Sequence, residues 1–369
     1  MRRKIGVVAS VLACLAALGC EYAVQHTTGV TNVRRMTKRD VAEAMPDASA
    51  ATNEVVFAGQ TVKEEGRKDN MDIWRISASS PNEIVRVTDD EANDWNPAYS
   101  TDGRTVAFDG NRVYTRAVWE KSSTGAGAVR QISEDGELSF GDPDVDDVGF
   151  VYVCEDSKMR MPGAHPVEVD DVGRAAGRVF LIPASTFCKC FEYFWKNMVF
   201  GWPWVDEDKI RSKHDRNGYL WLCDYDGKNA TEFVEGLGPQ LSPDGQRILF
   251  FKINADEKAD IWVVDRDGRN LTQLTHHPLN DIDPSWSPSG DRIAFASNRA
   301  ASWADRLFGD WNYDVWVMNS DGTGLMPLTS APQFEGHPCW GSDSDIYFHS
   351  YGGWWFFRNW DIWGMTLTR

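Results

Sequence analysis

The sequence predicts an all-β fold built from a repeated unit of four short strands. Apolar or β-branched runs of three to five residues recur along the chain, and Asp-Gly or Ser-Pro-x-Gly turns separate them. These turns supply the positive φ that a tight hairpin needs. The same order of runs and turns returns several times without a helical periodicity, so helix content is expected to be minor.

One stretch shows the unit most clearly, and its strands are named A to D here. Strand C is Asp260-Ile261-Trp262, strand D is Gln273-Leu274-Thr275, strand A is Pro284-Ser285-Trp286 and strand B is Ile293-Ala294-Phe295. Apolar runs of this length, bounded by turn residues, are typical of strands in an antiparallel meander. The C-strand pattern returns at 72–74, 219–221 and 314–316, each time ending in Trp.

This unit resembles the repeat of TolB-type β-propellers, a WD40-like family. The resemblance covers roughly residues 46–365, and it is more specific after about residue 219 than between 110 and 215. It implies one propeller domain over residues 31–369, with four strands in each blade.

Counting C and B strands predicts seven blades. The C strands are expected at Ile73, Val113, Val179, Leu220, Ile261, Val315 and Ile362, and the B strands begin near Val55, Val106, Phe150, Lys209, Ile248, Ile293 and Ile346. Six blades is the alternative, because residues 191–209 match the repeat too weakly to be counted as a blade. The last blade has a weak D strand, and the strand-like run 32–37 has no blade of its own. Lending this N-terminal strand to the last blade closes the ring and removes exposed edges.

The first residues are typical of an export signal. Arg2, Arg3 and Lys4 precede an apolar stretch, 5–18, which is shorter than the roughly 20 residues of a membrane-spanning helix. Gly19-Cys20 resembles a bacterial lipobox, which implies a signal peptide over 1–19, lipidation of Cys20 and a tether over 20–30. Glu21 does not signal inner-membrane retention, so an outer-membrane lipoprotein facing the periplasm is expected. The alternative is a secreted protein that happens to contain Cys20.

The composition restricts the partners. The chain of 369 residues carries a net charge of −17 without a basic stripe, so nucleic acid is not an expected partner. Only the lipid anchor is expected to touch a membrane. The chain is expected to be a monomer that binds an envelope protein or a glycan.

The two faces of the ring are expected to differ. Because strands alternate in direction, D-to-A and B-to-C connections share one face and short A-to-B and C-to-D turns share the other. The first face carries the long connections, and long loops on a rigid scaffold often bind ligands. Carboxylates at the channel mouth on this face would focus negative potential on a cation or a basic peptide. The predicted channel-mouth residues are Asp94, Asp142, Asp144, Asp281, Asp283, Glu335 and His337. The alternative is that an Asp before Pro simply starts strand A.

Several tryptophans lie outside the repeat positions, in the long B-to-C connections. They are Trp303, Trp311, Trp354, Trp355 and Trp360. They are predicted to form a stacking platform for a sugar or an apolar pocket for a peptide, and the alternative is a lid packed between blades.

Histidines near the same mouth leave a metal site open, although no cofactor is otherwise expected. The candidate ligands of a divalent metal are His276, His277, His337 and Asp281. Oligogalacturonate lyases are similar in being propellers of this repeat type that hold a metal with channel histidines, which implies a metal-dependent polysaccharide lyase as the alternative function. The chain has no Gly-x-Ser-x-Gly elbow and no expected catalytic domain after the propeller, so a serine protease is not expected.

The cysteines beyond Cys20 are odd in number, so at least one free thiol is expected. They are Cys154, Cys188, Cys190, Cys223 and Cys339. A bridge from Cys154 to Cys188 or Cys190 is the favoured pairing. Together, these patterns predict a non-catalytic, lipid-anchored envelope protein that binds its partner through a loop-rich, aromatic and acidic face.

Overall fold

The structure is a computed structural model. It describes residues 27, 29–37, 39, 41–61, 70–81, 83–113, 116–133, 139–155, 218–300, 312–330, 334–352 and 359–368. These residues form 24 strands in six antiparallel sheets of four strands. No helix of the described part is long and apolar enough to cross a membrane.

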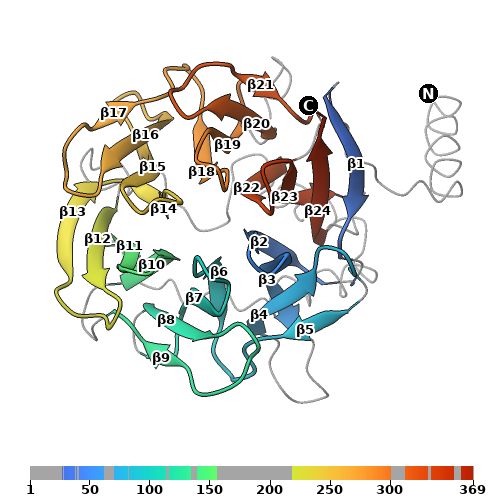
Figure 1. Cartoon of the computed structure of the whole chain (residues 1–369), viewed down its shortest axis with the longest axis vertical. Coiled ribbons are helices and arrows are strands. Elements are labelled where there is room, and N and C mark those ends of the chain that lie inside the picture. The colour runs from blue at the N-terminus through green and yellow to red at the C-terminus, as the bar shows by residue number, and fades with distance from the viewer. Residues whose placement is uncertain are drawn as a thin grey trace, which may run out of the picture.

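The six sheets are the blades of a propeller arranged around a central channel (Figure 1). Blade 1 contains β2 (Glu43–Ser49), β3 (Glu54–Thr61), β4 (Asn70–Ser77) and β5 (Ile84–Arg86); blade 2 contains β6 (Asp94–Tyr99), β7 (Thr105–Gly110), β8 (Ala117–Ser122) and β9 (Arg130–Gln131); blade 3 contains β10 (Ser139–Val145), β11 (Gly149–Glu155), β12 (Tyr219–Asp224) and β13 (Thr231–Glu235). Blade 4 contains β14 (Leu237–Leu241), β15 (Arg247–Ile253), β16 (Ala259–Asp265) and β17 (Thr272–Gln273); blade 5 contains β18 (Asp281–Trp286), β19 (Arg292–Ser297), β20 (Asp314–Asn319) and β21 (Met326–Pro327); blade 6 contains β22 (Phe334–Trp340), β23 (Asp345–Gly352), β24 (Asn359–Leu367) and β1 (Val30–Arg35). The first strand of each blade in chain order lies nearest the channel, except that β22 takes this place in blade 6 (Figure 1).

The N-terminal strand closes the ring, as the sequence predicts. β1 pairs antiparallel with β24, from Val30 opposite Leu367 to Arg35 opposite Trp363. Just beyond β1, the Met36 N–H donates to the Ile362 carbonyl at 2.7 Å. The last blade therefore takes its outer strand from the other end of the chain, and β24 is not an exposed edge.

The prediction of seven blades is wrong, and the alternative of six is correct. β11 pairs directly with β12, with Phe150 opposite Cys223 and Val153 opposite Leu220. Residues 156–217 are thus an insertion between two hydrogen-bonded strands of blade 3. The strands expected at Val179 and Lys209 lie outside the described residues, and the ladder of blade 3 is complete without them.

The C strand expected at Val113 lies elsewhere. The third strand of blade 2 is β8, which begins at Ala117, and its Trp119 lies opposite Phe108. The same aromatic pair joins B and C strands throughout the ring: Phe57 with Trp74, Tyr152 with Trp221, Phe250 with Trp262, Phe295 with Trp316 and Phe348 with Trp363. The B-strand ring of each pair is buried and packs between neighbouring blades, so these pairs fix the strand register around the ring.

A bulge followed by proline recurs in the strand that lines the channel. The register of each A strand shifts at one residue with φ between 45° and 56°, namely Met45, Asn96, Asp142, Gly238, Asp283 and His337. Proline follows each of them in the sequence. A left-handed residue at a bulge bends the strand and redirects its side chain, and it costs about 1 kcal/mol or more when the residue is not glycine.

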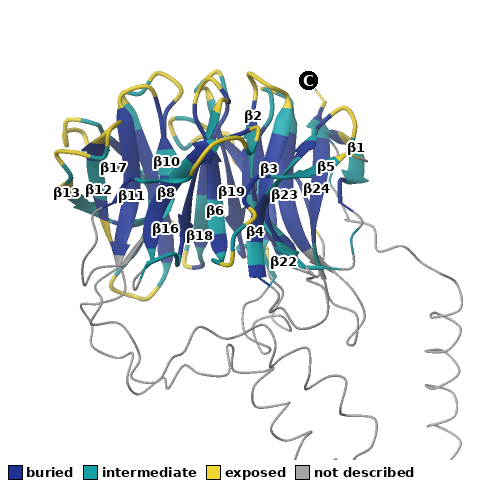
Figure 2. Ribbon diagram, turned by 90° about the horizontal axis from the view of Figure 1, so that it is seen from below, coloured by how far each residue is buried: buried dark blue, intermediate teal, exposed yellow. Residues whose placement is uncertain are grey.

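The two faces of the ring differ as the sequence predicts. Short A-to-B and C-to-D turns gather on one face, named the turn face, where they appear as exposed yellow hairpins in Figure 2. The opposite ends of the strands, where B-to-C and D-to-A connections begin, form the loop face. An A strand runs from the loop face to the turn face, so its first residues lie at one mouth of the channel and its last residues at the other.

No disulfide joins the described cysteines to one another. Cys223 and Cys339 are buried free thiols, which confirms the expected free cysteine. Cys154 is buried, whereas Cys188, Cys190 and the lipobox residue Cys20 lie outside the described residues. The predicted bridge and the predicted lipidation therefore stay predictions.

Candidate functional site

Four polar bulge residues lie where the channel approaches the loop face. The Asn96 amide donates to the Asp142 carboxylate across the boundary between blades 2 and 3. His337 Nε2 lies 3.4 Å from Asp283 Oδ2 across the boundary between blades 5 and 6. Asp142 and His337 are each 38% exposed, so they reach solvent, whereas Asp283 is 12% exposed. We name this set the bulge pairs.

Three predicted mouth residues lie in the first two positions of A strands, and the structure buries all three. Asp94, Asp281 and Glu335 are 0% exposed. Asp94 accepts a hydrogen bond from Arg112 Nη2 at 2.8 Å, and Asp281 accepts one from Arg299 Nη2 at 2.5 Å. In blade 1, Glu43 begins the A strand, is buried, and accepts a hydrogen bond from Arg39 at 2.5 Å. The sequence did not predict this residue as part of the site. The Asp94 and Asp281 ion pairs each join the start of an A strand to the residues that follow the B strand of the same blade, and the buried acids do not present a charged ring to solvent.

Glu335 departs from this pattern. Among the described residues, no arginine or lysine lies within ion-pair distance of its carboxyl group, and neither oxygen has a hydrogen-bond partner within 3.5 Å. Burial raises the pKa of Glu335 well above its usual value; the nearby Thr329 hydroxyl opposes this, and Asp314 raises the pKa further. Burial also raises the pKa of Asp94 to about 6, although Arg112 opposes the shift.

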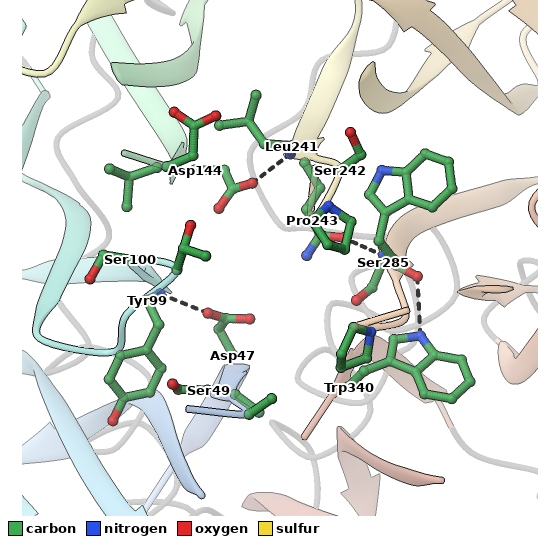
Figure 3. Close-up of a pocket in the computed structure, with 18 residues that line it drawn as sticks. Asp47, Ser49, Tyr99, Ser100, Asp144, Leu241, Ser242, Pro243, Ser285 and Trp340 are labelled. Carbon is green, nitrogen blue, oxygen red and sulfur yellow. Dashed lines mark hydrogen bonds between the residues drawn. The ribbon is translucent and has the colours of Figure 1, made fainter. Parts of the chain in front are cut away.

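Asp144 lies toward the turn face, not at the loop-side mouth where the sequence placed it. It comes after the bulge and Pro143, one residue before β10 ends. Its Oδ2 accepts the Leu241 N–H of blade 4 at 2.6 Å (Figure 3). Asp47 is the equivalent residue of blade 1, and its Oδ2 accepts the Tyr99 N–H of blade 2 at 2.7 Å (Figure 3). The recurring x-Pro-Asp tripeptide, 45–47 and 142–144, is the sequence signal that could have identified Asp47.

Burial raises the pKa of both carboxyl groups. The pKa of Asp144 rises to about 8, and Asp47 adds to the shift by like-charge repulsion. The pKa of Asp47 rises to about 6 because burial outweighs its hydrogen bonds to the backbone of Tyr99 and Ala48. Asp47 and Asp144 therefore lose their protons between mildly acidic and mildly basic pH.

Asp144→Asn is expected to make folding less sensitive to pH. A carboxyl group with a raised folded pKa stabilises the fold in full below the unfolded pKa of about 4, and this contribution is lost as pH rises through the folded pKa, here about 8. Each unit by which the folded pKa exceeds the unfolded pKa corresponds to about 1.4 kcal/mol of folding free energy lost at high pH. Thermal unfolding between pH 5 and 9 should show the variant gaining stability over the wild type as pH rises. The exposed neighbour Asp147, as Asp147→Asn, is the matched control; equal pH profiles for all three proteins would contradict the expectation.

The four candidate metal ligands do not come together. Asp281 is paired with Arg299, His276 is exposed after β17, and His277 Nδ1 accepts the Leu279 N–H at 3.2 Å. Within the described ranges, no group of three or more His, Cys, Asp or Glu side chains is arranged to hold a metal ion. The described residues therefore do not match the metal site implied by the resemblance to oligogalacturonate lyases.

One histidine beside the bulge pairs is part of the core, although the sequence reading placed no histidine there. His349 is 3% exposed, and its Nδ1 accepts the Met45 N–H at 3.0 Å. Burial, with repulsion from His337 added, lowers the pKa of His349 well below its usual value, so the ring is neutral. Its Nε2 is buried without a hydrogen-bond partner.

Among the predicted loop aromatics, only Trp360 is described. It lies in β24 and packs edge-on against His349, with ring centroids 4.6 Å apart, and against Phe334 at 5.5 Å. All three residues belong to blade 6, so this contact does not test the predicted lid between neighbouring blades. Trp303, Trp311, Trp354 and Trp355 lie outside the described residues, so their predicted role in binding is untested.

Comparison with known proteins supports the fold. No protein-family model matches the chain. The uncharacterized peptidase YuxL of Bacillus subtilis is 28% identical over 122 residues, which cover 32% of this chain and only 17% of YuxL. The uncharacterized protein Atu1656 of Agrobacterium fabrum is 27% identical over 221 residues, or 56% of this chain and 74% of that protein.

Solved propellers superpose over nearly the whole chain. A TolB-like protein from Agrobacterium tumefaciens aligns with a TM-score of 0.51 and 15% identity, covering 91% of this chain and 94% of that one. An oligogalacturonate lyase from Vibrio parahaemolyticus gives 0.52 and 14%, with 95% and 96% covered. An oligogalacturonate lyase in complex with manganese gives 0.50 and 14%, with 94% and 96% covered. At this identity the likeness establishes a TolB-like β-propeller fold and no activity.

Proposed function

We propose that this chain is a non-catalytic cell-envelope protein that binds a protein or glycan partner at the loop face of its propeller. The observation that carries the proposal is the set of bulge pairs. Two polar pairs, each from adjacent blades, meet the channel at strained positions, and strained backbone is often retained where side chains must be aimed at a ligand.

The charges of the bulge pairs favour a partner with hydrogen-bond donors or positive charge. Asp142 and Asp283 place carboxylates beside the channel; Arg116 Nη2 lies 3.8 Å from Asp142 Oδ1, and His337 Nε2 lies 3.4 Å from Asp283 Oδ2. A basic segment of a protein would complement them electrostatically, and sugar hydroxyls could donate to the same oxygens. The net charge of −17 adds attraction for a basic partner.

The signal-like segment supports a location in the envelope for this function. Its basic start, apolar stretch and Gly19-Cys20 support export and attachment through lipidated Cys20 to the outer membrane, with the propeller facing the periplasm. A lipid anchor would leave the ring free to present its loop face to an envelope component.

The double variant Asp142→Asn/Asp283→Asn is expected to weaken binding of an arginine-rich peptide by at least tenfold. Calorimetry on the full-length chain in detergent would measure this at low salt, with a neutral oligosaccharide as the second probe. The control is Asp102→Asn/Asp321→Asn, which removes the same charge from exposed turns on the other face. If both double variants lost the same affinity for the peptide, the effect would come from net charge alone, and this result would contradict a loop-face site.

A metal-dependent lyase is the second candidate, favoured only by the shape shared with oligogalacturonate lyases. Elemental analysis of the same preparation, never exposed to a chelator, separates the two. Stoichiometric manganese together with cleavage of oligogalacturonate would replace the binding function with the lyase.

A further inference from the structure

A cavity of about 220 Å³ lies at the turn-face end of the channel, apart from the bulge pairs. All six blades contribute to its wall through the ends of their A strands and the turns that follow (Figure 3). It is smaller than the roughly 300–1,000 Å³ typical of sites for drug-sized ligands. Its dimensions suit a single small group or the end of a side chain.

Two carboxylates face this cavity without a cation. The Oδ2 atoms of Asp47 and Asp144 each accept a hydrogen bond from a backbone N–H of the next blade, and this bond fixes the orientation of the carboxylate. Among the described residues, neither has an arginine or lysine within 4 Å. A third acid on the same wall, Asp146, differs because Arg266 binds it.

A buried hydroxyl completes the polar lining. Ser285 occupies the position after the bulge proline in blade 5, which is equivalent to Asp47 and Asp144 in their blades. It is 3% exposed, lines the cavity, and its Oγ has no hydrogen-bond partner. A buried hydroxyl without a hydrogen-bond partner is unfavourable, and a bound donor would remove this penalty.

We propose that this cavity binds an ammonium group, held by Asp47, Asp144 and the Ser285 hydroxyl. An ammonium group has three N–H donors and no acceptor, and the wall offers three acceptors that lack a cation. A divalent metal fits less well, because the described residues supply no group of three His, Cys, Asp or Glu ligands here. The ammonium group can belong to a free aliphatic amine or to a lysine side chain that enters from the turn face.

The raised pKa values of Asp47 and Asp144 agree with a site that accepts a cation. Burial raises both pKa values, and repulsion from Asp47 adds to the shift of Asp144; a cation between the two carboxyl groups would lower both values. Amine binding should therefore release protons at neutral pH, which calorimetry in two buffers of different ionisation enthalpy detects.

The experiment uses the full-length chain in detergent and titrates n-butylamine, cadaverine and a Gly-Gly-Lys-Gly-Gly peptide. The first two probe the free amine and the peptide probes the side chain. Tetramethylammonium carries the charge without N–H donors and should bind at least tenfold more weakly than n-butylamine. Preference for the peptide over cadaverine assigns the site to a lysine side chain, and the reverse assigns it to a free amine.

Variants locate the binding. Asp47→Asn/Asp144→Asn keeps an oxygen for each backbone N–H and should weaken n-butylamine at least tenfold, and Ser285→Ala should weaken it several-fold. Asp142→Asn/Asp283→Asn, at the bulge pairs, should leave amine binding unchanged, so this site can fail or succeed independently of the proposed loop-face function. No saturable amine binding by the wild type, equal affinity for tetramethylammonium, or Mn²⁺ binding abolished by the same Asp47 and Asp144 changes would overturn the proposal. If the double variant does not fold, Ser285→Ala and the tetramethylammonium comparison still decide it.

Discussion

Deleting residues 27–37 is expected to lower the unfolding temperature of the propeller by about 10 °C or more. The deletion removes β1 and with it two buried apolar side chains, Val30 and Met36, each worth about 2 kcal/mol. The ladder to β24 and the Met36 N–H bond to Ile362 add about 1 kcal/mol for each hydrogen bond lost. The sum is comparable to the whole stability of a typical domain.

The exposed edge of β24 should also change how the protein associates. An unpaired edge strand is a template for another chain, so light scattering should show dimers or larger species. A chain that begins at Thr27 keeps β1 and is the matched control. Adding a peptide of residues 27–37 should restore the melting temperature of the deleted chain. A truncated monomer that melts like the control would show that the ring does not depend on β1.

Arg299→Met is expected to cost about 3 kcal/mol or more of folding free energy. The variant leaves the 0% exposed carboxyl group of Asp281 with the Ser297 hydroxyl but without its arginine. Removing one partner of a buried ion pair typically costs 3–5 kcal/mol, because the remaining charge is not compensated. The Arg299 guanidinium also stacks 5.1 Å from the ring of Trp316, and this contact is lost as well. Denaturant unfolding with a common slope would measure the change.

A double-mutant cycle assigns the role of Asp281. Combining Arg299→Met with Asp281→Asn should recover part of the loss, because the amide no longer buries a charge and keeps an acceptor for Ser297. The control is Arg269→Met, which breaks the exposed pair with Asp267 and should cost less than about 0.5 kcal/mol. If Arg299→Met left stability unchanged while Asp281→Asn abolished partner binding, Asp281 would be the ligand-binding residue that the sequence predicted.

The candidate site was only partly predictable for a physical reason that Asp281 and Asp283 illustrate. Both lie in one A strand, two residues apart, and composition cannot separate them. The strand register buries Asp281 against Arg299, whereas the bulge turns Asp283 toward the channel and His337. Whether an arginine 18 residues later reaches Asp281 depends on the tertiary structure. The carboxylates predicted from their positions in loops therefore included both buried groups paired with arginine and groups that face the channel.

The sequence by itself determined the four-strand repeat, its turns, the closing N-terminal strand and the described B and C strands other than the C strand of blade 2. Each of these depends on local chemistry: apolar runs of strand length, Asp-Gly and Ser-Pro-x-Gly turns, and an outer strand that one blade lacks. Only the tertiary structure decided the number of blades, because β11 pairs with β12 across some 70 positions of sequence. Two strands can pair across a long insertion, so the sequence alone does not show which strands belong to one blade. The tertiary structure also decided which acids meet arginine and which face the channel, because burial and register are set by the neighbouring blade and not by the strand that carries the residue.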